Sequence, residues 1–287
     1  MRALITVLLA TTRVLLATRR VLLVTTRVLL AATPVLLAAT LAGSAFAAGD
    51  NACYVASGLV HADFALPRVA AAIEGKHLNI VVLGSASSTL PGQDGPAKAY
   101  PAHLQDALTR RLPGIAVKVI THTKARESAA EMGKTLEQML VDDKPDLTIW
   151  QTGTVDAMLG VDPDDFRSAL DEGLDTLQAG KSDIVFMNMQ YSPRTDSMIA
   201  LGSYLDAMRF VALQREVLLF DRLAVMKDWN EMGVFDLYTA TKKTDTAERV
   251  HDCIGRLLAG LIVEGASLAQ ESNTGSGNTG AHNKDLH

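Results

Sequence analysis

The chain has 287 residues, of which 48% are hydrophobic, 21% are charged and 5% are aromatic, with two cysteines and a formal net charge of −5. This composition excludes an intrinsically disordered chain, a disulfide-stapled miniprotein and a collagen-like sequence. Beyond the first 48 residues, 22 basic and 32 acidic side chains leave a net charge of −10. Since phosphate binding needs clustered Lys and Arg, we expect no nucleic-acid partner.

The N-terminal segment predicts a secretory signal peptide over residues 1–47. Five heptads between residues 7 and 41 each open with Val-Leu-Leu, the arginines stop at Arg27, and Ala45-Phe46-Ala47 supplies a small-x-small cleavage pattern. We expect cleavage after Ala47 or one residue later, a periplasmic or secreted mature protein, and membrane contact only during export. An uncleaved membrane anchor is the alternative, because the apolar stretch is long enough to span a bilayer.

Export would place the two cysteines in an oxidising compartment. A bond between Cys53 and Cys253 would close a loop of about 200 residues, whereas the alternative is two buried thiols. The scattered histidines and distant cysteines indicate no metal site, and the chain carries no phosphate-binding or dinucleotide-binding glycine motif. We therefore expect no cofactor.

From residue 78 the chain alternates between short apolar runs and amphipathic segments. The runs predict strands over 78–83, 115–120, 147–151, 184–190 and 217–220, and the segments between and after them predict helices over 97–112, 127–140, 164–179, 197–214 and 247–268. Apolar strands separated by helices predict an α/β fold, a three-layer α/β/α sandwich with a five-stranded parallel sheet. This domain would span residues 48–270, followed by a disordered polar tail over 271–287.

Ligands of such a sheet bind at the carboxyl ends of the strands. A serine of the 85–88 run would lie there at a helix N-terminus, where backbone N–H groups stabilise a developing oxyanion. A serine-rich turn is also a common helix cap or phosphate-binding turn. A nucleophilic serine needs a base and an acid that orients the base, and His251 with Glu248 three residues earlier offers both.

Residues 78–265 resemble the SGNH subgroup of GDSL-type hydrolases, a flavodoxin-like family. The resemblance rests on "VVLGSASST", "KPDLTIWQTGTVDAM" and "ERVHDCIGRLLAGLI", which stand where that family has Gly-Asp-Ser, Gly-x-Asn-Asp and Asp-x-x-His. It implies that Ser87 is the nucleophile, with Ser85 as the second choice. It also implies that His251 is the base and that Glu248 replaces the usual aspartate, with Asp252 and Asp245 as alternatives.

Two positions depart from that family's pattern. Val155 occupies the place of the third-block asparagine, and Arg126 lies about where the second-block glycine belongs. Losing one oxyanion donor costs about two to three orders of magnitude in rate. The expected compensating donors are Gly153, Thr154 and Arg126, and Gln190 is expected either to contact substrate or to hydrogen-bond within its loop.

These residues predict an exported serine esterase that acts through an acyl-enzyme on O-acetyl groups of carbohydrate. Its partner would be a small ester or an acylated carbohydrate. An acyltransferase using the same site is one alternative. Val155 and Arg126 motivate a second, a weakened or inactive module that binds a polysaccharide or a partner protein. A flavodoxin-like cofactor binder is a third.

Overall fold

The computed structural model describes residues 53–56, 58–239 and 244–278. The chain divides into two compact units, Met1–Tyr54 and Val55–His287, and the second unit holds the sheet and its helices. The expected signal peptide over residues 1–47 lies outside the described part. None of the helices described is both long enough and apolar enough to cross a bilayer.

Five parallel strands form a single sheet in the order β2-β1-β3-β4-β5. The prediction of a five-stranded parallel sheet is therefore confirmed. The strands are β1 (His77–Gly84), β2 (Ala116–Thr123), β3 (Leu147–Gln151), β4 (Asp183–Met187) and β5 (Leu218–Phe220).

The central strands are buried on both faces, as their continuous apolar runs require. Ile80 of β1 pairs with Val119 of β2 on one side and Leu147 of β3 on the other, and all five residues of β3 are buried. β2 lies at an edge, where its residues are half-buried or exposed. The core of the unit therefore lies around β1, β3 and β4.

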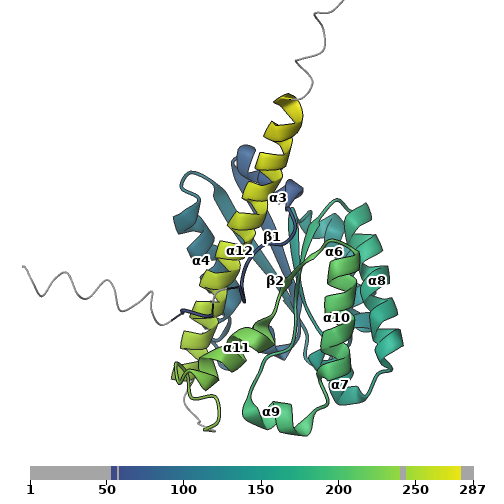
Figure 1. The fold of residues 1–287 in the computed structure, drawn as a ribbon, viewed down its shortest axis with the longest axis vertical. Coiled ribbons are helices and arrows are strands. Elements are labelled where there is room, and N and C mark those ends of the chain that lie inside the picture. Colours follow the sequence, from purple (N-terminus) through teal and green to yellow (C-terminus); the bar gives the residue numbers. More distant parts are fainter. Residues whose placement is uncertain (1–52, 57, 240–243, 279–287) are drawn as a thin grey trace, which may run out of the picture. The chain divides into compact units, whose positions relative to one another are not determined.

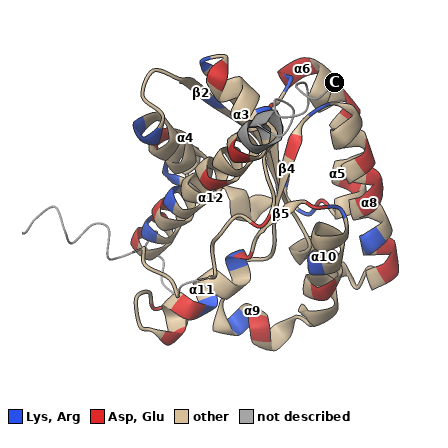
Figure 2. Cartoon of the chain, turned by 45° about the horizontal axis from the view of Figure 1, so that its top comes forward, with Lys and Arg blue, Asp and Glu red and all other residues tan. Residues whose placement is uncertain are grey.

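Helices cover both faces of the sheet, which confirms the three-layer sandwich (Figure 1). One layer consists of α3 (Pro67–Glu74), α4 (Tyr100–Arg111) and α12 (Asp245–Asn278). The other consists of α5 (Ala129–Gly133), α6 (Leu136–Asp143), α8 (Pro163–Ala179) and α10 (Gly202–Gln214). Lys, Arg, Asp and Glu are interspersed over these helices, with several acidic residues along α8 (Figure 2).

Two predicted helices are each divided in two. Residues 127–140 form α5 and α6, because α5 starts at a capping box between Ser128 and Glu131 and already ends at Gly133. Residues 197–214 belong to α9 (Pro193–Met198) and α10, which are separated by extended backbone at Ile199.

Further differences concern short helices and the C-terminus. The sequence patterns did not indicate α3, α7 (Thr154–Leu159) or α11 (Arg222–Glu231), nor the 3-10 turns η1 (Ala86–Ser88) and η2 (Pro96–Lys98). Elements this short carry too few turns for a clear period of 3.6. α12 continues to Asn278, so the expected polar tail begins within the helix, and residues 279–287 lie outside the description.

A glycine sets the distance between α4 and α12. A Cβ atom at Gly255 would lie 2.7 Å from the Cβ of His103 and 2.8 Å from the backbone nitrogen of Leu104. Real Cβ contacts are longer, so only glycine permits this approach. The close approach brings the first turn of α4 to His251 of α12, and this contact shapes the site.

Candidate active site

A cavity of about 780 Å³ opens at the carboxyl ends of β1 and β3. Six side chains expected at the site line it: Ser85, Ser87, Arg126, Thr154, Gln190 and His251. Its apolar wall consists of Leu90, Val155, Met158 and Leu159, together with alanines. The topology therefore brings together residues that are up to 166 positions apart in the chain.

The serine-rich turn directly follows β1 and forms η1. Ser87 is half-buried, and its hydroxyl donates to Oε1 of Gln151 at 3.0 Å. Ser85 Oγ lies 3.5 Å from Ser87 Oγ. Ser88 is fully buried, donates to the same Gln151 oxygen at 2.6 Å and lies 3.1 Å from the Tyr100 hydroxyl. Ser85 and Ser87 thus line the cavity, while Ser88 ties the turn to β3 and α4.

His251 is 4% exposed and lies in the second turn of α12. Its Nδ1 accepts the backbone N–H of Tyr100 at 3.0 Å. When the ring is neutral, an accepting Nδ1 places the hydrogen on Nε2. Burial lowers the pKa of His251 to about 3, and the nearby charges of Arg222 and His103 add to the effect. Within the described residues, no serine hydroxyl is hydrogen-bonded to this ring.

Within the described residues, Glu248 is not hydrogen-bonded to His251, in contrast to its expected role. Its carboxylate accepts from Lys98 Nζ at 3.0 Å and from Thr244 Oγ1 at 2.6 Å, and these bonds hold its pKa below the ordinary value. The imidazole also prevents this hydrogen bond, because an Nδ1 that accepts a backbone N–H has no hydrogen to donate to a carboxylate.

The alternative acids do not orient the ring either. Asp252 pairs with Arg256 at 2.7 Å and with His103 at 3.5 Å. Asp245 begins α12, where an acidic side chain favours the helix dipole. No acid of the described chain therefore completes a serine–histidine–carboxylate triad.

The expected oxyanion donors lie at the start of α7. Gly153, with φ at +95°, is the N-cap, and Thr154 is the first residue of the helix. The Thr154 hydroxyl is buried and has no hydrogen-bond partner. Asp156 is buried behind them and accepts from the backbone N–H of Ala129 at 2.9 Å, and burial raises its pKa. It thereby holds α7 against the start of α5. Arg126, an exposed residue with φ at +66°, lies in the loop just before α5.

Arg222 is a site residue that the sequence patterns did not single out. It is the first residue of α11, directly after β5, and it is 0% exposed. Its Nη1 donates to the Ser87 carbonyl at 3.1 Å, and its Nη2 donates to Gln190 Oε1 at 3.3 Å. Its position at a strand's carboxyl end is the one signal that could have indicated it.

Gln190 thus contacts Arg222 and also lines the cavity. Asn188, from the same loop, holds α11 in place instead. Its Nδ2 donates to Asp221 Oδ1 at 2.7 Å, and its Oδ1 accepts from the backbone N–H of Leu223 at 3.0 Å. Asn188 therefore links its loop to the start of α11.

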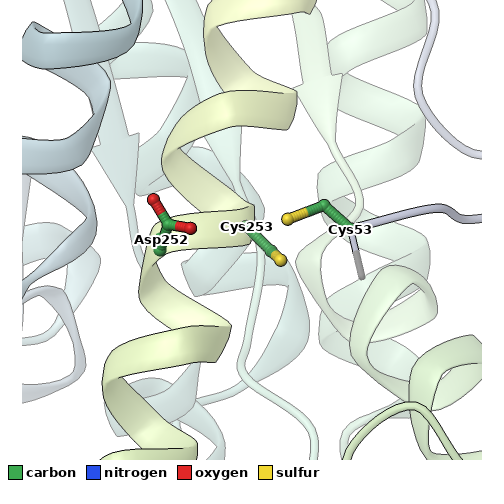
Figure 3. A group of neighbouring side chains, drawn as sticks. All are labelled: Cys53, Asp252 and Cys253. Atoms are coloured by element: carbon green, nitrogen blue, oxygen red, sulfur yellow. The ribbon is translucent and has the colours of Figure 1, made fainter. Parts of the chain in front are cut away.

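Both cysteines are disulfide-bonded, which decides between the two alternatives drawn from the sequence. Figure 3 shows Cys53 and Cys253 with Asp252 beside them. Although these three residues lie close enough together to be considered as metal ligands, disulfide sulfurs are not thiolates.

Comparison with known proteins relates this geometry to a family. Residues 52–268 match the Non-GDSL lipase-like family. Among solved structures, an acetyl-xylooligosaccharide esterase from Geobacillus stearothermophilus is 13% identical, with 64% of this chain and 93% of that chain covered and a TM-score of 0.51. The psychrotrophic esterase EstA from Pseudoalteromonas is 16% identical, with 64% and 96% covered and a TM-score of 0.50. No curated protein matches significantly. At these identities the two structures share the fold, which is that of SGNH hydrolases.

Proposed function

Because the chain belongs to the Non-GDSL lipase-like family, we propose that its cavity binds acyl compounds and holds them without a working serine–histidine pair. The cavity combines an apolar wall with polar groups, as an acyl ligand requires. Val155, Met158 and Leu159 of α7 and Leu90 form an apolar wall, while Ser87 and His251 lie among the polar residues. Each buried methylene of an acyl chain contributes about 0.8 kcal/mol to binding.

The observation that carries the proposal is the hydrogen bond from the Tyr100 N–H to Nδ1 of His251. A general base must offer a lone pair to the serine proton, and in this tautomer Nε2 carries a hydrogen instead. The ring is also a weak base, because burial and the charge of Arg222 lower its pKa to about 3. The Ser87 proton points to Gln151 rather than to the ring.

The position of the serine supports the same conclusion. β1 ends at Gly84, and η1 begins two residues later at Ala86. Ser87 matches the serine of Gly-Asp-Ser only if one residue is inserted after Gly84; without that insertion, Ala86 occupies the serine's position. Its methyl group lines the cavity and cannot attack a carbonyl.

Ester hydrolysis through Ser87 is the second candidate. It is favoured by the family and by the fact that Ser87 and His251 line one cavity. Unliganded sites often hold catalytic groups loosely, and hydrolysis would require a ring rotation that turns an unprotonated nitrogen to Ser87. In this candidate the ester is the O-acetyl group of a carbohydrate, as the sequence resemblance implies.

Activity-based labelling combined with binding separates the two candidates. We expect the full chain to bind p-nitrophenyl octanoate without burst release of nitrophenol, and to remain unlabelled by a fluorophosphonate probe. Labelling that disappears in Ser87→Ala but persists in Ser267→Ala, an exposed serine of α12, would establish the hydrolase instead. Turnover that Ser87→Ala, Ser85→Ala and His251→Asn all leave unchanged would come from another site.

We further propose that the protein is exported after cleavage near Ala47. The disulfide-bonded state of both cysteines supports this, since such bonds persist in oxidising compartments. Intact mass measurement of the protein recovered from the producing cells tests it. A mature N-terminus at residue 48 or 49 is expected, and an uncleaved chain in the membrane fraction would contradict the proposal.

A further inference from the structure

Buried polar atoms without hydrogen-bond partners gather around one place in the described part of the chain. They are Nε2 of Gln151, Oγ1 of Thr154 and Nε of Arg222. Gln151 and Arg222 both bond to Ser87, and Thr154 lines the same cavity as Ser87. Leaving a buried donor unsatisfied costs about 1–3 kcal/mol, and two of these atoms belong to residues that line cavities, Thr154 and Arg222, where a ligand could satisfy them.

Among these three residues, Arg222 has the largest free-energy cost of burial, because it carries a charge. It forms no ion pair with any acid of the described residues, and the ring of Tyr100 lies 5.8 Å from its guanidinium carbon. Burial lowers its pKa only to about 10, so the guanidinium keeps its charge at neutral pH. Burying a charge without a counter-charge is unfavourable by several kcal/mol.

A smaller hollow of about 270 Å³ leads to this charge. Arg222 lines it, and Gln190 and His251 line both this hollow and the main cavity. Asp236, the acid of the hollow, already accepts from the backbone N–H groups of Tyr238 and Thr239. The 3.3 Å bond between Arg222 and Gln190 is long, and an incoming oxygen could replace it.

The hydrogen-bonding groups offered to a ligand here are mainly donors. Nε2 of His251 carries a hydrogen, and Arg222 offers N–H groups. Among the residues that the structure describes, Arg126 and no acid line the main cavity, although the chain as a whole is acidic. The buried cation of the smaller hollow and the apolar wall of the main cavity, joined through Gln190 and His251, complement an anionic group attached to a hydrocarbon chain.

We propose that the site binds a monocarboxylate with an aliphatic chain, whose carboxylate pairs with Arg222 while the chain lies along Leu90, Val155, Met158 and Leu159. This inference rests on the proposed acyl-binding function and specifies the ligand's head group. A carboxylate fits better than a phosphate dianion, because a single buried cation and a neutral imidazole balance one negative charge rather than two.

Two ligands with the same chain test the inference by calorimetry at pH 8, dodecanoate and 1-dodecanol. We expect the full chain to bind dodecanoate at least about tenfold more tightly, and Arg222→Met to bring the ratio near one while dodecanol binding persists. Arg222→Lys should keep part of the preference, because the charge remains and the planar fork is lost. Arg215→Met, which removes an arginine outside the cavity, should leave the ratio unchanged.

Each other outcome is decisive. Equal affinity of the unmodified protein for both ligands would overturn the carboxylate inference and leave the acyl-binding function standing. Binding of neither would overturn both. Circular dichroism checks the fold of Arg222→Met. Should that variant not fold, Arg222→Lys decides: a preference for dodecanoate that is clearly smaller than that of the unmodified protein supports the inference, and an unchanged preference contradicts it.

Discussion

The helices within each of the two layers are held together by different kinds of contact. On one face, α4 and α12 meet through the close approach at Gly255 and the bond from Tyr100 to His251. On the other, Arg215, just after α10, forms ion pairs with Asp171 and Asp175 of α8 at 3.1 and 2.5 Å. The first contact is buried and fixes the state of a site residue, whereas the second is partly exposed and leaves the cavity untouched. The chemistry of His251 is therefore set by helix packing.

The largest expected effect is at Gly255. Gly255→Ala should lower the free energy of unfolding by about 2–3 kcal/mol, because the added methyl group would collide with the backbone of α4. Chemical denaturation measures this. Gly260→Ala on the same helix is the matched control, since its Cβ would meet nothing within 4 Å, and it should stabilise by about 0.5–1 kcal/mol. Equal effects of the two variants would contradict close packing.

The second effect is a dependence on pH. The folded-state pKa of His251 is depressed to about 3, so its contribution to stability is complete above about pH 6.5 and is lost as pH falls towards 3. His251→Asn keeps an acceptor for the Tyr100 N–H but does not titrate. Between pH 6.5 and 5 it should flatten the slope of unfolding free energy by about 1 kcal/mol per pH unit.

A substitution that changes no titratable group serves as the control for this prediction. Ser267→Ala, at an exposed position of α12, should retain the slope of the unmodified protein. An unchanged slope in His251→Asn would mean that the ring is already accessible to protons in the folded state.

The smallest effect is expected on the α8–α10 face. Arg215→Met should lower the free energy of unfolding by about 0.5–1 kcal/mol, because partly exposed ion pairs are screened by water and salt. The loss should shrink further in 1 M NaCl. A loss above about 2 kcal/mol, or one insensitive to salt, would show that the two faces are held in the same way.

The strands were predictable because each is a short apolar run, and their parallel order brings Ser87, Thr154, Gln190 and His251 to one cavity as expected. The roles of these residues within the cavity could not be predicted from the sequence. Whether Glu248 faces the imidazole depends on Lys98 and Thr244, which compete for its carboxylate and have no visible link to it in the sequence.

The tautomer of His251 and the burial of Arg222 could not be predicted from the sequence either. The first depends on a backbone N–H contributed by α4, 151 residues away in the chain. The second depends on β5 ending so that α11 begins inside the molecule, although an arginine at the start of a helix is commonly exposed.

Met158 stands at the rim of the cavity with 65% of its surface exposed. Peroxide reaches such a thioether readily and converts it to a polar sulfoxide, while the fully buried Met132, Met187 and Met189 are shielded. The sulfoxide would make the apolar wall of the cavity more polar, so oxidation during storage should lower the affinity for the proposed acyl ligand while the melting temperature stays almost unchanged.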